Sequence, residues 1–170
     1  QALDKEARLQ DYKRPAILAF ARANKLDRIV TTGGANAKIG IITTGKSYLD
    51  VRQALDELGI DEVACNEMGI RIYKIGMTWP LEPQGVLKFA QGLEQIIVVE
   101  EKRSLIETQV KEQLYDQTDR PRVVGKKDEN EQWLFPAKYA LDPTDIAIKI
   151  GERLIRKGCP DGIKDKVATL

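Results

Sequence analysis

Residues 37–59 read AKIGIITTGKSYLDVRQALDELG, and this stretch decides the fold of the chain. A β-branched run over residues 39–44 ends at Gly45, and an amphipathic run over residues 47–58 follows at once. β-branched residues favour strands, whereas apolar residues spaced three and four apart favour a helix. The stretch therefore predicts a strand, a glycine turn and a helix, with Ser47 as the N-cap of that helix.

The same stretch contains GIITTGKS, from Gly40 to Ser47, which satisfies the phosphate-loop pattern G-x-x-x-x-G-K-[ST]. A phosphate loop places its first glycine at the end of a strand and wraps the next residues around a phosphate. Here those residues are two isoleucines and two threonines, which are stiff and favour a strand. Gly40 is therefore expected inside the strand, which leaves only Thr44, Gly45 and Lys46 to turn. A small nucleotide-binding protein that uses this octapeptide is kept as the alternative function.

A second feature keeps that alternative open. Residues 95–101 read QIIVVEE, an apolar strand that ends in Glu100 and Glu101. A nucleotide hydrolase uses an acidic residue at such a strand end to hold Mg²⁺. The structural interpretation is that one acid points outward and the other bonds to an amide of a neighbouring loop, while Lys102 and Arg103 are placed to neutralise both.

Composition limits the class of protein. The 170 residues are 42% hydrophobic and 31% charged, which is typical of one soluble globular domain. The net charge of +1 gives no electrostatic reason to expect nucleic acid or a membrane as partner. No apolar run approaches the roughly 18 residues of a membrane span, and no secretory signal is visible, so a cytoplasmic location is predicted. The chain opens on Gln1 within a helical pattern, so we expect it to be a piece of something longer.

The cysteine and histidine counts restrict the chemistry further. There is no histidine, which removes Ser-His and Cys-His pairs, histidine bases and most zinc sites. The two cysteines, Cys65 and Cys159, are far apart and are expected to be free thiols. Two cysteines are too few for an iron–sulfur cluster of the four-cysteine kind. Glu62 and Glu67 raise the expected pKa of Cys65, which makes it a poor nucleophile. No catalytic residue and no metal site are predicted.

The rest of the chain alternates helices with short apolar strands. Residues 1–25 are predicted as a helical lead-in that breaks near Pro15, 26–157 as a single α/β domain, and 158–170 as a tail or linker. Ser104 and Glu107 resemble a capping box for a helix over residues 104–115. Such alternation predicts a mostly parallel sheet covered on both faces. Further helices are expected over residues 61–68, 83–92 and 142–155, and further strands over residues 26–32, 69–76 and 121–125.

Ligands of parallel sheets bind at the carboxyl ends of the strands. Those ends supply the candidates for ligand contact or a substrate channel, and no group among them combines a nucleophile, a base and oxyanion donors. The residues alone therefore predict an α/β domain without a self-contained active site. The candidates are Thr44, Gly45, Lys46, Ser47, Met77, Trp79, Glu100 and Glu101.

The order of three sequence runs resembles a known family. IGIITTGKSYLDVRQAL, GIRIYKIGMTWPLEP and GLEQIIVVEEKRSLIETQVKEQLYD resemble the middle domain of thiamine-diphosphate-dependent 2-oxoacid:ferredoxin oxidoreductases, closest to the long indolepyruvate type. The resemblance spans residues 18–154. It implies a fold like the C-terminal domain of transketolase, a three-layer α/β/α sandwich with a five-stranded, mostly parallel sheet. Residues 28–32 would form its antiparallel first strand, and Gly45 would only turn the chain.

The resemblance also implies a function for the parent enzyme. This family oxidatively decarboxylates 2-oxoacids such as indolepyruvate or pyruvate, using thiamine diphosphate, Mg²⁺ and iron–sulfur clusters, and passes electrons to ferredoxin. The chain shows neither the diphosphate-and-metal motif nor a cysteine-rich cluster motif. The implied role is therefore structural, with the cofactors held by other domains or subunits, which are the expected partners, and ferredoxin a partner of the whole enzyme.

Overall fold

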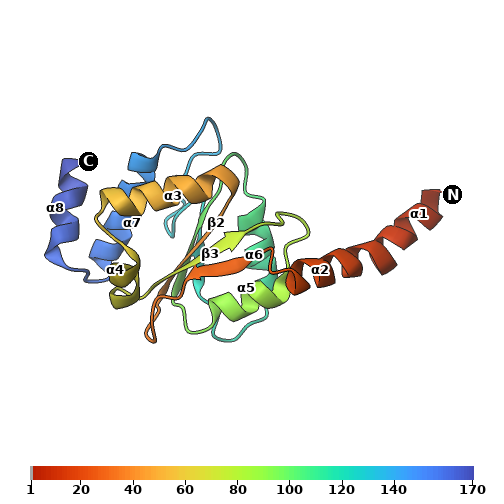
Figure 1. The fold of residues 1–170 in the computed structure, drawn as a ribbon. Helices are drawn as coiled ribbons and strands as arrows, with labels where there is room; N and C mark the ends of the chain where they lie inside the picture. The colour runs from red at the N-terminus through yellow and green to blue at the C-terminus, as the bar shows by residue number, and fades with distance from the viewer. Residues whose placement is uncertain (1) are drawn as a thin grey trace.

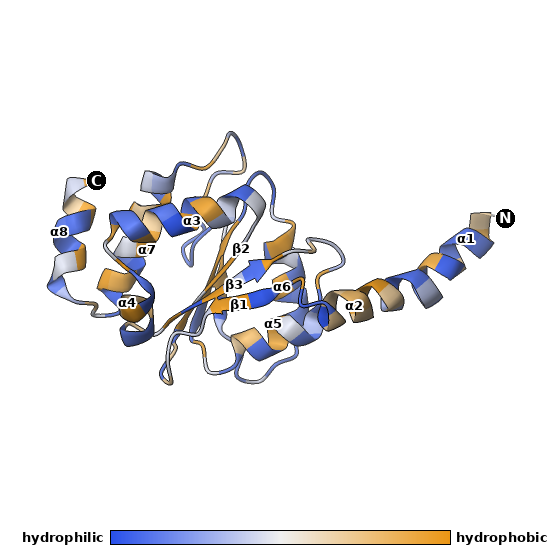
Figure 2. Ribbon diagram, viewed as in Figure 1, coloured by the Kyte–Doolittle hydropathy of each residue, from blue (hydrophilic) through white to orange (hydrophobic). Residues whose placement is uncertain are grey.

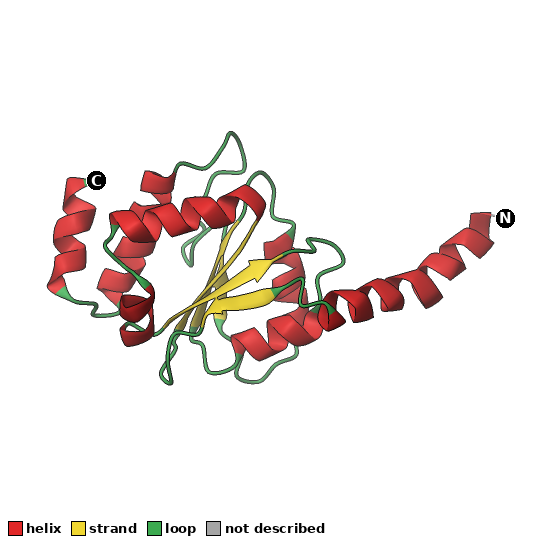
Figure 3. Ribbon diagram, in the orientation of Figure 1, coloured by secondary structure: helices red, strands yellow, loops and turns green. Residues whose placement is uncertain are grey.

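A mixed sheet organises the computed structural model, which describes residues 2–170. Its five strands lie in the order β1-β3-β2-β4-β5. Figure 3 shows the strands in yellow, with helices around them. β1 runs antiparallel to β3, and the remaining neighbours are parallel. The predicted five-stranded, mostly parallel sheet with an antiparallel first strand is therefore confirmed. The strands are β1 (Arg28–Thr31), β2 (Ile39–Thr44), β3 (Ile70–Ile75), β4 (Gln95–Val99) and β5 (Arg122–Val124).

Helices cover both faces of this sheet (Figure 1). One face packs against α3 (Gly45–Glu57), α4 (Glu62–Glu67) and α7 (Pro143–Arg156). The other face packs against α5 (Pro83–Ala90) and α6 (Ile106–Leu114). The predicted α/β/α sandwich is thus confirmed, and its two apolar cores are separated by the sheet. Among residues 2–170, no helix combines the length and apolarity needed to cross a bilayer.

The central strand β2 shows why the deciding stretch folds as it does. Ile41 faces the core under α3 and α7, whereas Ile42 faces the core under α5 and α6, as the alternation of a strand requires. Gly40 lies on the second face. A Cβ atom there would stand 2.6 Å from Leu93 Cδ1 and 2.7 Å from Phe89 Cζ. The first glycine of the octapeptide therefore allows α5 to pack closely on the sheet.

The phosphate-loop alternative is wrong, because the octapeptide contains no loop. Gly40 pairs with Arg71 and Ile96 inside the sheet, and β2 continues to the residue before α3. Gly45, with φ of +52°, makes the whole turn from strand to helix. The prediction of Ser47 as N-cap is also wrong. Thr44 occupies the N-cap position and its hydroxyl donates to the Ile75 carbonyl at 2.8 Å, while Ser47 is buried in the first helical turn.

The N-terminal segment is continuous where a break was predicted. α1 (Ala2–Arg8), the π-helix η1 (Leu9–Lys13) and α2 (Arg14–Ala23) follow one another without a loop and project from the sandwich (Figure 1). Pro15 does mark a change of helix type, because it is the second residue of α2, which directly follows the π-helix. A proline ring crowds the carbonyl four residues earlier, and the wider turn of a π-helix relieves that crowding.

The predicted tail over residues 158–170 contains a helix, α8 (Asp161–Thr169). Ile163 of α8 is buried in the core beside α7. Val167 fills the space above Gly151 of α7, where an added Cβ would lie 2.3 Å from Val167 Cγ2. This helix has only a weak sequence pattern, because just two side chains of a short, charged segment, Ile163 and Val167, make its apolar face. The division of the chain into lead-in, domain and linker stays a prediction.

Both cysteines are free thiols, as predicted. Burial raises the pKa of Cys65 to about 11, and the charges of Asp61 and Glu62 add to the shift. The acidic neighbours were the predicted cause of a raised pKa, whereas the larger cause is burial of Cys65 in the core. Cys65 is therefore an inert core thiol.

Candidate functional site

The carboxyl ends of β2, β3 and β4 meet at one edge of the sheet, where the predicted site residues lie. Lys46 lies at this edge, at the start of α3. Its Nζ lies 2.9 and 2.8 Å from the two carboxylate oxygens of Asp50, and 3.6 Å from Glu101 Oε1. These acids raise the pKa of Lys46, with the Asp50 hydrogen bond as the main cause. The amine is thus paired with carboxylates. The structure brings Lys46 and Glu101 together and adds Asp50, whose spacing of four residues on α3 could have identified it.

Glu100 has a structural role at the same edge. Its side chain is buried, and Oε2 accepts the backbone N–H groups of Leu105 at 3.1 Å and Ile106 at 2.8 Å. Oε1 accepts the N–H of Glu107 at 3.0 Å. Glu100 therefore caps α6 from outside the helix. The predicted capping box of Ser104 and Glu107 is wrong, because α6 begins at Ile106 and no side chain of that segment caps it.

A buried lysine completes this network. Lys126 is 8% exposed, and its Nζ donates to the Glu100 carbonyl and, at 3.4 Å, to the Pro136 carbonyl. Its backbone N–H donates to Glu107 Oε2 at 2.9 Å, and Glu107 also accepts from Lys111 Nζ at 2.6 Å. Burial lowers the pKa of Lys126, and the nearby glutamates oppose that shift. No local sequence pattern marks Lys126, because its partners Glu100, Glu107 and Pro136 lie 10 to 26 residues away.

The loop after β3 is fixed at both ends. The N–H groups of Gly76 and Met77 donate to Asp27 Oδ1 at 2.7 and 3.0 Å. Leu81 donates its N–H to Gln109 Oε1 at 2.8 Å. The other carboxylate oxygen of Asp27 is buried without a hydrogen-bond partner, and burial raises the pKa of this carboxyl. Met77, a predicted site residue, is therefore held through its backbone.

Trp79 is the most exposed apolar residue of this loop. Its side chain is 56% exposed, the bond to Pro80 is cis, and the guanidinium of Arg14 lies 5.9 Å from the centre of its ring. The carbonyl of Thr78 accepts from Gln109 Nε2 at 2.9 Å. Trp79 thus stands at the surface between the carboxyl edge and α2, where a neighbouring domain can reach it.

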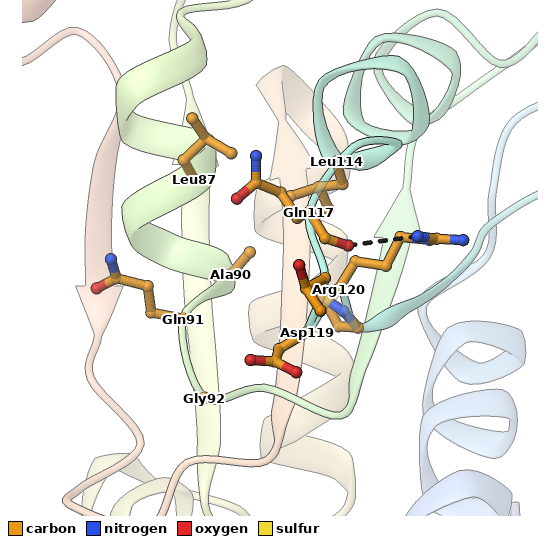
Figure 4. Close-up of a pocket in the computed structure, with 10 residues that line it drawn as sticks. Leu87, Ala90, Gln91, Gly92, Leu114, Gln117, Asp119 and Arg120 are labelled. Atoms are coloured by element: carbon orange, nitrogen blue, oxygen red, sulfur yellow. Dashed lines mark hydrogen bonds between the residues drawn. The ribbon is translucent and has the colours of Figure 1, made fainter.

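A cavity of about 360 Å³ lies at the opposite edge of the sheet. Leu87 and Leu114 line it from α5 and α6, and Arg120 on its rim donates to the Gln117 carbonyl at 3.3 Å (Figure 4). None of the predicted site residues lines this cavity. Across residues 2–170, no three His, Cys, Asp or Glu side chains are placed to hold a metal ion. The predicted site residues lie instead at the carboxyl edge, where the side chains form ion pairs and a helix cap and where Trp79 is exposed.

Comparison with known families gives a match over most of the chain. The family model described as "Indolepyruvate oxidoreductase domain" matches residues 29–170. The indolepyruvate oxidoreductase subunit IorA of Thermococcus kodakarensis is 41% identical over 95 residues, which are 55% of this chain and 13% of that subunit. The chain thus matches a small part of this curated relative.

Two solved structures are similar at low sequence identity. One is a 2-oxoglutarate:ferredoxin oxidoreductase from Magnetococcus marinus, with 17% identity and a TM-score of 0.49 over 75% of this chain and 19% of that one. The other is described as a split-gene transketolase, an inactive beta4 tetramer, with 14% identity and a TM-score of 0.48 over 76% of this chain and 41% of that one.

Proposed function

Because the chain belongs to the indolepyruvate oxidoreductase domain family, we propose that it is a structural domain of a 2-oxoacid:ferredoxin oxidoreductase. The observation that carries the structural role is the use of the charged side chains at the carboxyl edge. Glu100 caps a helix, and Lys46 is paired with Asp50 and Glu101. These side chains stabilise the start of α6 and link α3 to the end of β4.

The parent enzyme would oxidatively decarboxylate a 2-oxoacid, with indolepyruvate as the substrate named for its relatives. Thiamine diphosphate, Mg²⁺ and iron–sulfur clusters would supply that chemistry, and ferredoxin would accept the electrons. The residues of this chain do not fit those groups. Cys65 is buried in the core and Cys159 is half-buried against the same core, and residues 2–170 contain no cluster of metal ligands. We therefore assign the cofactors to other domains or subunits of a cytoplasmic enzyme.

The contribution of this domain would be to hold the cofactor-binding parts in place. Its carboxyl edge is suited to that task because the loop of Met77 and Trp79 is fixed by Asp27 and Gln109 on both sides. A rigid edge with an exposed aromatic ring is typical of a docking surface. At the same edge, Thr44, Gly45 and Ser47 form the turn from β2 into α3.

The test is turnover of the parent enzyme with Lys46→Ala and Trp79→Ala, measured as 2-oxoacid-dependent reduction of ferredoxin per assembled complex. We expect kcat to stay within about twofold of the wild type, because neither side chain touches a reacting group. Lys127→Ala, at an exposed loop lysine paired only with Glu131, is the matched control. A loss of about a hundredfold in kcat from an intact assembly would assign these residues to the chemistry and refute the structural role.

A further inference from the structure

The N-terminal rod, residues 2–23, has little contact with the rest of the domain. α1 and η1 contain no buried residue, and Ala21 is the one buried residue of α2. Figure 2 shows apolar residues along the rod as it leaves the sandwich. The exposed apolar side chains are Leu3 (78%), Leu9 (42%), Tyr12 (72%), Ile17 (40%) and Phe20 (54%).

Most helices in proteins are stabilised by packing of an apolar face more than by the helix propensity of their residues. Ile17 and Phe20 are three residues apart and are therefore neighbours on the helix surface. The exposed apolar side chains are the part of the rod that a partner would bury.

A concave seat lies where the rod meets the domain. A cavity of about 330 Å³ opens between the rod, the loop after β3 and α6. Its apolar lining is Leu18, Pro80, Leu81 and Pro83, and its polar lining is Arg14, Gln109, Glu112 and Gln113. Trp79 stands beside it under the guanidinium of Arg14. The rod thus contributes Leu18 to the seat, directly after the exposed Ile17 in the sequence.

Charge indicates the chemistry of the partner. The rod carries five basic and three acidic side chains. Because Arg22 is paired with Glu82 of the sandwich, the remaining side chains have a net charge of +1. A second copy of the rod would carry the same net charge, and like charges disfavour that pairing. An apolar surface with an acidic rim is complementary. The similar IorA subunit has only 13% of its length within the match, so most of a subunit of that kind lies outside this domain.

We propose that the N-terminal rod and the seat beside Trp79 bind an apolar surface with an acidic rim, located on another domain of the same parent subunit. This inference rests on the proposed function. The rod would then couple the position of the domain to its neighbour, since α2 is attached to the sandwich through Arg22, which pairs with the buried Glu82 at 2.7 Å.

The test is hydrogen exchange measured by mass spectrometry on the isolated 170-residue chain and on the parent subunit. We expect residues 2–20 to exchange at least about a hundredfold more slowly in the parent, because burial prevents local opening of the rod. In the parent, Ile17→Asp with Phe20→Asp should remove that protection and leave exchange in β2 unchanged. Tyr115→Asp, at an exposed aromatic residue on the opposite edge, is the matched control and should leave the rod protected.

Equal exchange of the rod in both proteins would overturn the proposal. Sedimentation of the isolated chain tests the other occupant, because a dimer that the double Asp variant abolishes would assign the surface to a second copy and also overturn it. Ferredoxin reduction by the same parent subunit separates this inference from the proposed function. Active enzyme with an unprotected rod refutes only the docking surface, whereas a protected rod in a protein without that activity refutes only the proposed function.

Discussion

Two adjacent glutamates at the end of β4 should differ sharply in their contribution to stability. Glu100 is 4% exposed and accepts three backbone hydrogen bonds at the start of α6. Glu101 is 30% exposed in its side chain, and its one ion pair is with Lys46 at 3.6 Å. Replacing each by alanine therefore separates a buried helix cap from a surface ion pair.

The loss of unfolding free energy in Glu100→Ala follows from the backbone N–H groups that the substitution would leave without an acceptor. The N–H groups of Ile106 and Glu107 are buried, and a buried donor without an acceptor costs about 1–3 kcal/mol. We expect a loss of about 3–5 kcal/mol, a large part of the roughly 5–15 kcal/mol of a typical domain. Glu101→Ala should cost about 0.5 kcal/mol or less, as exposed ion pairs do.

Urea unfolding followed by far-ultraviolet circular dichroism measures both variants against the wild type. Glu100→Gln is an informative intermediate, because its amide keeps one acceptor oxygen and presents a donor where the second stood. We expect its loss of stability to fall between those of the two alanine variants. If Glu100→Ala unfolded within about 0.5 kcal/mol of the wild type, the capping role assigned to Glu100 would be refuted.

Two further predictions concern the core and acid stability. Gly40→Ala should destabilise the domain by about 1–3 kcal/mol through overpacking, since the new methyl group would meet Leu93 and Phe89; a thermal unfolding midpoint equal to the wild type would show that α5 does not need this glycine. Glu129 forms two hydrogen bonds to the buried Arg153, at 2.7 and 3.1 Å, which lower its pKa to about 2. Because the unfolded pKa is about 4.3, this stabilisation is present above that pH and is lost as the pH falls towards 2. Screening at the partly exposed carboxylate reduces it from about 3 to about 1–2 kcal/mol. Glu129→Gln should therefore destabilise at pH 7 and differ little from the wild type near pH 2, and a pH-independent difference in unfolding free energy would contradict the ion pair.

The sheet could be predicted because its determinants are local. Continuous β-branched runs identified β2 and β4, and the stiffness of Ile41 and Ile42 argued correctly against a phosphate loop. The glycine turn at Gly45 was likewise visible in sequence. These features depend on residues within a few positions of one another, so a single sequence contains the information that determines them.

The candidate site was harder to predict because its contacts are long-range. The cap of α6 by Glu100 spans only five to seven residues and agrees with the prediction that one acid bonds to a loop amide. The burial of Lys126, in contrast, joins segments up to 26 residues apart. The contact between Arg14 and Trp79 joins the rod to a loop after β3. No local pattern marks such pairs. Helix α8 was not predicted for a similar reason, because its short apolar face is buried only by packing against Gly151 of α7, which is distant from Val167 in the sequence.

Calorimetric titration of the 170-residue chain with Mg-ATP and Mg-GTP tests most directly the claim that the octapeptide from Gly40 to Ser47 is a strand and a turn. We expect no heat of binding for either nucleotide, in the wild type and in Lys46→Ala alike. Binding at about micromolar affinity, roughly −8 kcal/mol, that is abolished by Lys46→Ala would show instead that the octapeptide is a nucleotide-binding loop.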